Sequence, residues 1–396
     1  MSGTLTHPTA LAVTDERATR LLVDLVSTPS LSMHEHACVK LLTASMAALG
    51  FDSTIDASGS AVGVRGDPSR SAKEIVLLGH IDTVPGVVPV RMEGDVFYGR
   101  GSVDAKGPLA AFTIAAALAT LPPGVRVRVI GAVEEESATS KGARFAATNY
   151  RADACIIGEP SGVEGVTLGY KGRLIARLDL ETDSSHSAGP EATAAELAFE
   201  VWSRVRAACE ARTAGSNRIF DQVQTRLRSI HSDHDGLADR AVLTIGFRIP
   251  PGVLPTELEA ICAEATSNIS ARSNWHFVGH EVAYVADRSN VVVRALMGAI
   301  RSETSVGREQ LPQHSPTPNP RLHRGGGFGM TPTPKLKTGT SDMNVVGPIW
   351  NCPIAAYGPG DSSLDHTPNE HIRISEYLAS IRILTRAIEA IAGELL

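Results

Sequence analysis

Residues 74–86 read EIVLLGHIDTVPG, an apolar run that ends in a histidine and, two positions later, an aspartate. A nearly continuous apolar run is typical of a strand that is covered on both faces, as in a sheet with helices on either side. VIGAV at residues 129–133 and ACIIG at residues 154–158 have the same character. These three runs predict the central strands of an α/β domain.

Helices are expected between and after these strands. Residues 32–50, SMHEHACVKLLTASMAALG, open with a capping-box pair, Ser32 and Glu35, and stop at Gly50. The mildly apolar stretch LAAFTIAAALATL at residues 109–121 is too short to cross a membrane and predicts a buried helix. Further helices are expected near Asn290 and over residues 376–396.

The middle of the chain has a different pattern. RLIARLDLE, which starts at Arg173, alternates apolar and charged residues, as is typical of a half-exposed strand in an antiparallel sheet. AVLTIGFRIP at residues 241–250 predicts another strand, and two helices are expected to begin near Pro190 and Pro255, because proline suits the first turn of a helix. Residues 171–285 are therefore expected to form an α+β domain inserted into a larger α/β domain, which consists of residues 1–170 and 286–396.

Composition restricts the class of protein. The 396 residues are 43% hydrophobic and 20% charged, as in soluble globular proteins. The net charge of -6 argues against nucleic acid as the main partner. The N-terminal residues lack the basic start and apolar block of a signal peptide, so no membrane partner is expected. The five cysteines are scattered and odd in number, which favours free thiols in the cytoplasm over a disulfide framework.

Polar residues follow the predicted buried strands where each strand ends. They are His80, Asp82, Glu134, Glu135, Glu136 and Glu159. Asp104 lies in a glycine-rich turn just before a predicted helix, and His366 lies in a turn after the apolar segment PIAAYG. In open α/β sheets, ligands bind at the carboxyl ends of the strands, so these side chains are expected to share one crevice. Their nitrogen and oxygen atoms suit two zinc ions, and cobalt or manganese would accept the same set. Asp82 is well placed to bind the second ring nitrogen of His80.

Charge also favours metal ions in this crevice. Two zinc ions bring about +4, three ligating carboxylates about -3 and a bridging hydroxide about -1, which leaves the site near neutrality. Three consecutive glutamates after an apolar strand would repel one another strongly without cations nearby. The simpler alternatives are a core histidine at the end of a strand and a solvated acidic turn.

The chain contains, in order, the motifs GHIDTVP, GRGSVDAKG, EEE, GEPS, SSHSAGP, GTSD and DHTPNEH. This set resembles that of the dinuclear-zinc amidohydrolases, which include acetylornithine deacetylase, succinyl-diaminopimelate desuccinylase and bacterial glutamate carboxypeptidases. The resemblance implies a zinc-peptidase-like catalytic domain with a mixed sheet flanked by helices, and a ferredoxin-like inserted domain that acts as a lid and in dimerisation. It implies the following roles: His80 and Glu159 on one metal, Glu136 and His366 on the other, Asp104 bridging them, and Glu135 as general base.

The resemblance also implies a role for His186 in SSHSAGP. In a homodimer, this residue would reach across to the partner subunit's site and stabilise the tetrahedral oxyanion, and the alternative is an ordinary loop histidine. The chain departs from the family pattern at Ala105, where methionine usually follows the bridging aspartate, and in a slightly longer segment after Glu136. Neither departure touches a ligand.

Arg248 and the GTSD turn are the expected anchors for a substrate α-carboxylate, with Gly339, Thr340 and Ser341 supplying donors. GYKGR, KTGTSDMN and YGPGDSSLDHTPNEH are most similar to a branch of the family that acts on a small acidic amino-group carrier protein. Its members release lysine or ornithine from the carrier's C-terminal glutamate, in lysine or arginine biosynthesis. The alternatives are a deacetylase of N-acetylornithine or N-acetyl-lysine, a desuccinylase of N-acyl diamino acids, a metallocarboxypeptidase, or a catalytically inactive relative.

Two stretches rich in basic residues could dock such a carrier. Residues 204–228 contain Arg204, Arg206, Arg212, Arg218, Arg226 and Arg228. Residues 310–341, which hold no acid, contain Arg321, Arg324, Lys335 and Lys337. Ordinary surface charge is the alternative interpretation of both stretches.

Three other features of the sequence do not support a functional site. HSDHD at residues 231–235 follows no predicted buried strand and is expected to be a solvated turn in a polar loop. HRGGGFG at residues 323–329 lacks the lysine ending of a phosphate-binding loop and lies in a long surface loop expected for residues 312–334. The chain has no G-x-S-x-G elbow, which argues against a serine hydrolase.

Overall fold

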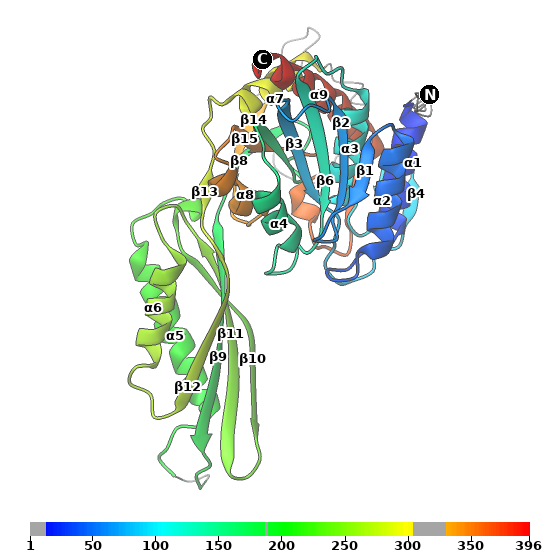
Figure 1. Ribbon diagram of the computed structural model, residues 1–396. Coiled ribbons are helices and arrows are strands. Elements are labelled where there is room, and N and C mark those ends of the chain that lie inside the picture. The colour runs from blue at the N-terminus through cyan, green and yellow to red at the C-terminus, as the bar shows by residue number, and fades with distance from the viewer. Residues whose placement is uncertain (1–12, 187–188, 304–329) are drawn as a thin grey trace, which may run out of the picture.

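The computed structural model of the chain describes residues 13–186, 189–303 and 330–396. A mixed sheet lies at the centre of the larger body, with strand order β1-β2-β6-β3-β7-β15-β8-β13 and with β14 paired to β8 (Figure 1). Its strands are β1 (Asp52–Ile55), β2 (Ala61–Gly66), β3 (Lys73–His80), β6 (Val125–Ala132), β7 (Ala154–Gly158), β8 (Gly165–Tyr170), β13 (Tyr284–Val285), β14 (Thr333–Lys337) and β15 (Ile354–Ala356).

The three apolar runs are the central strands of this sheet, as predicted. β3 is parallel to both β6 and β7, with His80 opposite Ala132 and Gly79 opposite Gly158. The outer pairs β1–β2 and β2–β6 are antiparallel, which makes the sheet mixed. Parallel neighbours end at the same edge of a sheet, so the segments that follow β3, β6 and β7 begin side by side.

Helices cover both faces of the sheet. One face, which includes Ile75 and Leu77, packs against α1 (Asp15–Ser27), α2 (His36–Ala48), α3 (Lys106–Leu118), α7 (Val291–Ser302) and α9 (Ile374–Glu394). The other face, which includes Val76 and Leu78, packs against α4 (Lys141–Asn149) and α8 (Asp342–Trp350). This two-sided burial explains why β3 is apolar at every central position. A small sheet of β4 (Arg91–Glu93), β5 (Val96–Tyr98) and β16 (His371–Arg373) lies beside the main one.

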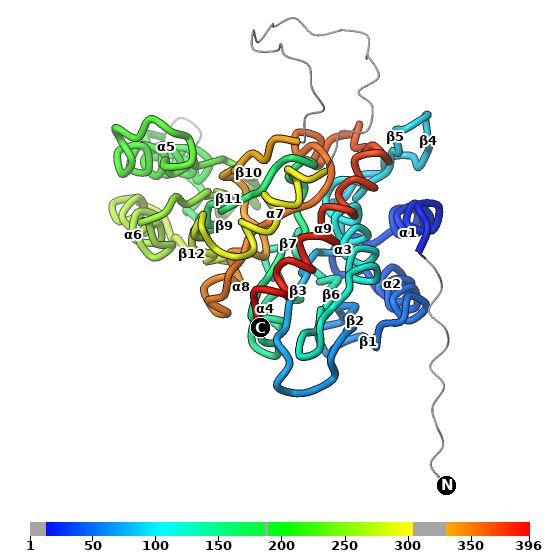
Figure 2. The backbone as a smooth tube through the Cα atoms, turned by 90° about the horizontal axis from the view of Figure 1, so that it is seen from above, coloured from blue at the N-terminus to red at the C-terminus, as the bar shows by residue number. Residues whose placement is uncertain are grey.

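A second, fully antiparallel sheet has the strand order β10-β11-β9-β12. Its strands are β9 (Gly172–Asp183), β10 (Gln224–His234), β11 (Ala238–Ile249) and β12 (Arg272–Glu281). The helices α5 (Ala194–Arg212) and α6 (Pro255–Thr266) lie together on one face of this sheet (Figures 1 and 2). The alternating residues of β9 pack against them in a hydrophobic core separate from that of the main sheet. The chain enters this sheet from β8 and returns from β12 to β13.

Two predicted helix starts are wrong. Helix α2 begins at His36 with no side-chain cap, because Ser32 Oγ donates to Asp82 Oδ2 at 2.7 Å instead of capping the helix. Helix α5 begins four residues after Pro190, since Thr193 caps it by accepting a hydrogen bond from the Glu196 N–H. Ser32 has a partner fifty positions away, which the local pattern did not indicate, whereas Thr193 and Glu196 form a local capping box that marks the true start of α5.

The HSDHD prediction was wrong in its local structure. Residues 231–234 belong to the exposed edge strand β10, although the side chains are solvated as expected. Most of the loop expected at residues 312–334 lies outside the described residues, and its last two residues begin β14. Among the helices that the structure describes, none combines the length and the apolar character needed to cross a membrane.

Candidate metal centre and active site

The predicted polar residues surround the carboxyl edge of the central strands. His80 is the last residue of β3, Glu134–Glu136 follow β6, and Glu159 follows β7 directly. Asp104 precedes α3, and His366 lies between the 3-10 turn Ser362–Leu364 and β16. The fold thus brings together side chains that are up to 286 positions apart, the separation between 80 and 366.

Two groups of side chains have ligand atoms within 4.8 Å of one another and could each hold a metal ion. One group is His80, Asp104 and Glu159, and the other is Asp104, Glu136 and His366. Asp104 belongs to both, because its Oδ1 lies 3.1 Å from His80 Nε2 and its Oδ2 lies 3.0 Å from His366 Nε2. This is the grouping that the family resemblance implied, and a carboxylate shared in this way is suited to bridging two cations.

Asp82 links His80 to the glutamate run. The ring Nδ1 of His80 lies 3.1 Å from the Asp82 carbonyl oxygen and 3.5 Å from its Oδ1. The backbone N–H groups of Glu135 and Glu136 each donate to the Asp82 carboxylate at 3.0 Å. Although burial opposes ionisation, the hydrogen bond and charge of His80 hold the pKa of Asp82 below its usual value. A contact of this kind fixes the orientation of an imidazole and leaves its other nitrogen for a metal.

The turn that carries Asp104 is held by a residue that the sequence analysis missed. Glu370 is fully buried, and its Oε1 accepts from the backbone N–H groups of Gly101 at 2.9 Å, Val103 at 3.0 Å and Asp104 at 3.1 Å. Its Oε2 accepts from Arg100 at 2.8 Å. The available signal was its place in DHTPNEH, the motif that also contains His366.

Three glutamates of this centre resist ionisation, whereas Asp104, although buried, has its pKa lowered by hydrogen bonds from His366 and His80. Burial, followed by the charge of Asp104, raises the pKa of Glu159 to about 8. Burial also raises the pKa of Glu135 and of Glu136. Hydrogen bonds to Asp104 and Glu136 raise the pKa of His366 to about 11. Buried like charges at this density are stabilised by divalent cations, so the donor set fits a metal pair.

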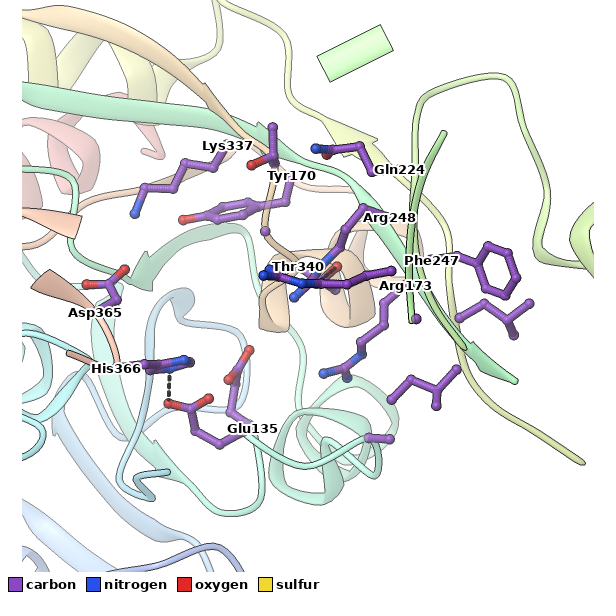
Figure 3. Close-up of a pocket in the computed structure, with 18 of the residues that line it drawn as sticks. Glu135, Tyr170, Arg173, Gln224, Phe247, Arg248, Lys337, Thr340, Asp365 and His366 are labelled. Atoms are coloured by element: carbon purple, nitrogen blue, oxygen red, sulfur yellow. Dashed lines mark hydrogen bonds and ion pairs between the residues drawn. The ribbon is translucent and has the colours of Figure 1, made fainter. Parts of the chain in front are cut away.

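A cavity of about 1240 Å³ opens from this centre towards the second sheet. Figure 3 shows Asp365, His366 and Glu135 on one side of it, and Arg173, Arg248 and Thr340 on the other. Burial and the neighbouring Arg173 lower the pKa of Arg248, whose Nη1 donates to Thr340 Oγ1 at 2.7 Å. The cavity is therefore acidic near the candidate metal ligands and cationic near the second sheet.

The predicted substrate anchors are placed differently from one another. Arg248, Gly339 and Thr340 line the cavity. Ser341 is buried and uses its hydroxyl to cap α8, accepting from the Met343 N–H at 3.2 Å.

His186, the predicted oxyanion donor, is exposed, lies beyond the far end of β9 and does not line the cavity. Because β9 runs from Gly172 to Asp183, its far end lies about 36 Å from the start of the strand.

The basic stretch at residues 204–228 divides into two parts. Four of its arginines are paired with nearby acids: Arg204 with Glu200, Arg206 with Glu210, Arg212 with Glu257 and Arg218 with Asp221. Arg226 and Arg228 are exposed, line the cavity and form no ion pair with any residue that the structure describes. In the second stretch, Arg321 and Arg324 lie outside the described residues, whereas Lys335 and Lys337 donate to the carbonyl oxygens of Ser161 and Pro160.

A mixed α/β sheet whose strand ends carry two ligand groups joined by one aspartate, beside a buried glutamate, is the arrangement of a dinuclear metal-dependent hydrolase. The sequence comparison agrees with this class. Residues 76–319 match the model of peptidase family M20/M25/M40, and the chain belongs to this family of hydrolases. The resemblance drawn from the motifs is thereby confirmed.

Particular relatives are similar along nearly the whole chain. A LysW-lysine hydrolase of Deinococcus radiodurans is 44% identical over 388 residues, which cover 96% of this chain and 98% of the relative. A LysW-lysine/LysW-ornithine hydrolase of Sulfurisphaera tokodaii is 30% identical over 80% of this chain and 81% of the relative. Among solved structures, a metallo-carboxypeptidase of Sulfolobus solfataricus has the same fold, with a TM-score of 0.73 at 17% identity, covering 95% of this chain and 99% of that one.

Proposed function

We propose that this protein releases lysine or ornithine from the C-terminal glutamate of an acidic amino-group carrier protein, by metal-dependent hydrolysis of an amide bond. The observation that carries the proposal is the 44% identity, over 96% of the chain, to a protein named for hydrolysis of LysW-bound lysine. The ligand groups joined by Asp104 and the presence of Glu135 support catalysis over a role as an inactive relative.

Two zinc ions would be held by these side chains: His80 and Glu159 on one, Glu136 and His366 on the other, and Asp104 between them. Cobalt or manganese would accept the same ligands. The metal pair, when bound, lowers the pKa of a water molecule and polarises the amide carbonyl. Glu135, buried beside the ligands, takes the proton of the attacking water and passes it to the departing amine. Asp82 keeps the His80 ring oriented.

A homodimer is part of the proposal, because His186 lies far from the cavity of its own subunit. Residues 171–285 would serve as lid and dimerisation domain, so that His186 of each subunit supplies the oxyanion donor to the other. Strand β10 supports this, since it is an edge strand of the second sheet and is exposed along most of its length. An unpaired edge strand is a ready surface for pairing with a second copy.

The volume and the charged side chains of the cavity suit a substrate that is attached to a carrier protein. The volume of about 1240 Å³ exceeds the ~300–1,000 Å³ of ordinary small-molecule pockets. Arg226 and Arg228 offer unpaired cations to an acidic carrier, and Arg248 with Thr340 offers donors to a carboxylate. A cytoplasmic location is proposed as well, since all five cysteines are free thiols.

The test compares release of free lysine and ornithine from the carrier conjugates with release from the matching N-acetyl amino acids. The zinc-loaded protein is compared with Glu135→Gln, which keeps the shape of the side chain and removes the base. Preference for the conjugates, lost in the variant, is expected. Preference for the acetylated amino acids would reject the carrier and favour a deacetylase.

A further inference from the structure

Five acidic side chains line the cavity, and only one of them lacks a role in the proposed chemistry. Asp104, Glu136 and Glu159 belong to the candidate ligand groups, and Glu135 is the proposed base. The fifth is Asp365, which belongs to neither ligand group.

The Asp365 carboxylate has no partner in the described part of the chain. Its Oδ1 is buried without a hydrogen bond, and the side chain forms no ion pair with any residue that the structure describes. The charge of Lys337 acts on Asp365, but the two side chains form no ion pair, and Lys337 Nζ donates to the carbonyl oxygen of Pro160. Buried carboxylate oxygens in native proteins are nearly always hydrogen-bonded, so this atom is an exception that a ligand would remove.

A second polar atom is unpartnered in the same part of the cavity. Tyr170 is 2% exposed, and its hydroxyl is also buried without a hydrogen bond. Its ring extends towards the side of the cavity that holds Asp365 and Lys337 (Figure 3), and the two side chains are close enough to interact electrostatically. The carboxylate and the phenol oxygen together offer acceptors to one donor-rich group.

The proposed substrate carries one such group. Lysine and ornithine bear a distal ammonium, which has three N–H donors and no acceptor. Their α-carboxylate has cations available along the opposite wall, since Arg228 and Arg248 form no ion pair with any residue in the described ranges. Among the described residues that line the cavity, Asp365 is the one acid left for the ammonium.

Resting on the proposed function, we infer that Asp365, assisted by the Tyr170 hydroxyl, binds the distal ammonium of the amino acid being released. Asp365 is thus a specificity-determining residue that selects diamino acids over neutral amino acids of similar length. The selection follows from leaving a buried acceptor unsatisfied when the substrate lacks the ammonium.

The test uses two carrier conjugates that differ only at the distal end, one with lysine and one with norleucine, which lacks the ammonium. Wild-type protein is expected to favour the lysine conjugate in kcat/KM by about 10- to 100-fold, the usual worth of a charged hydrogen bond. Asp365→Asn should reduce this preference to below about threefold, with kcat/KM for the norleucine conjugate nearly unchanged. Tyr170→Phe should reduce it in the same direction and by less.

Asp361→Asn is the matched control, since it makes the same change in the same loop. Asp361 is exposed, does not line the cavity and accepts a hydrogen bond from the Ser363 N–H that asparagine can also accept. The Asp361→Asn variant should prefer the lysine conjugate as strongly as the wild type does. Zinc content is measured for every variant, because His366 is adjacent to Asp365 and a merely supporting role would lower metal occupancy.

The inference would be overturned if Asp365→Asn lowered kcat/KM equally for both conjugates, or if it left the preference for the lysine conjugate unchanged. If that variant does not fold, competition in the wild type decides instead: free lysine should inhibit more strongly than free norleucine, and equal inhibition would contradict the inference. A wild-type protein that cleaves neither conjugate would reject the proposed function itself, and this assignment with it.

Discussion

The carboxylate of Glu370 accepts a hydrogen bond from the backbone N–H of Asp104 at 3.1 Å, and thereby joins the two loops that carry a shared ligand and His366. Glu370 lies four residues after His366, from 366 to 370, and its Oε1 accepts two further backbone N–H groups of the Asp104 turn. One buried residue therefore links the turns that carry Asp104 and His366, two candidate ligands that lie 262 positions apart, the separation between 104 and 366.

Glu370→Gln is expected to weaken zinc binding by about 10- to 100-fold, the usual effect of losing a contact that orients a ligand. The amide keeps one acceptor oxygen but loses the charge that three N–H donors and Arg100 share. Titration with a competing chelator measures the affinity. The control is Glu93→Gln, at an exposed residue that pairs with Arg91 and belongs to neither ligand group, and an unchanged affinity in Glu370→Gln would contradict the positioning role.

Zinc binding should strengthen as pH rises. Without metal, burial and the Asp104 charge raise the pKa of Glu159 to about 8, and hydrogen bonds to Asp104 and Glu136 raise that of His366 to about 11. Both groups therefore hold protons at neutral pH that a metal ion must displace, and raising the pH removes this competition. Calorimetry in two buffers of different ionisation enthalpy should detect proton release. Heats that are independent of the buffer would argue against these ligands.

Much of the fold followed from patterns that burial imposes directly. β3 and β7 are covered on both faces and are apolar over residues 75–79 and 154–158, and β6 is apolar over residues 129–132, where it approaches the site. The polar residues that follow these three strands mark the edge of the sheet. Patterns whose meaning depends on distant partners were less reliable. Ser32 was expected to cap a helix, but Asp82, fifty positions away, accepts its hydroxyl hydrogen bond.

Charge patterns show the same limit at the candidate site. The arginines of residues 204–228 look alike in sequence, yet four of them are paired with acids on neighbouring turns or on α6, and only Arg226 and Arg228 line the cavity. Glu370 was missed because a buried carboxylate that holds backbone N–H groups has no local signature. Composition gives the number of charges, whereas only the fold shows which of them are neutralised.

Arg248→Ala is expected to raise KM for the carrier conjugate by about 10- to 100-fold with a smaller change in kcat, because a charged donor to the substrate carboxylate is lost. Arg248 is half-buried and forms no ion pair with a described residue, so its guanidinium remains available to a ligand. Steady-state kinetics measure the effect. Arg206→Ala, which removes an arginine paired with Glu210 on α5, is the control, and an unchanged KM in Arg248→Ala would remove the anchor.

Two inactive variants should restore activity when they are mixed, if His186 acts across a dimer. Each complete site needs Glu135 from one subunit and His186 from the other, and β9 holds these residues far apart within one subunit. His186→Ala and Glu135→Gln should each be inactive alone, whereas refolding or co-expressing them together forms heterodimers with one intact site. Random pairing would then give about one quarter of the wild-type activity.

Mixing Glu135→Gln with Glu136→Gln is the control, because both substitutions damage the cavity of the subunit that carries them. Those heterodimers have a defect in each site, so they should stay inactive. Activity absent from the first mixture, with heterodimers demonstrated by mass, would place His186 outside catalysis.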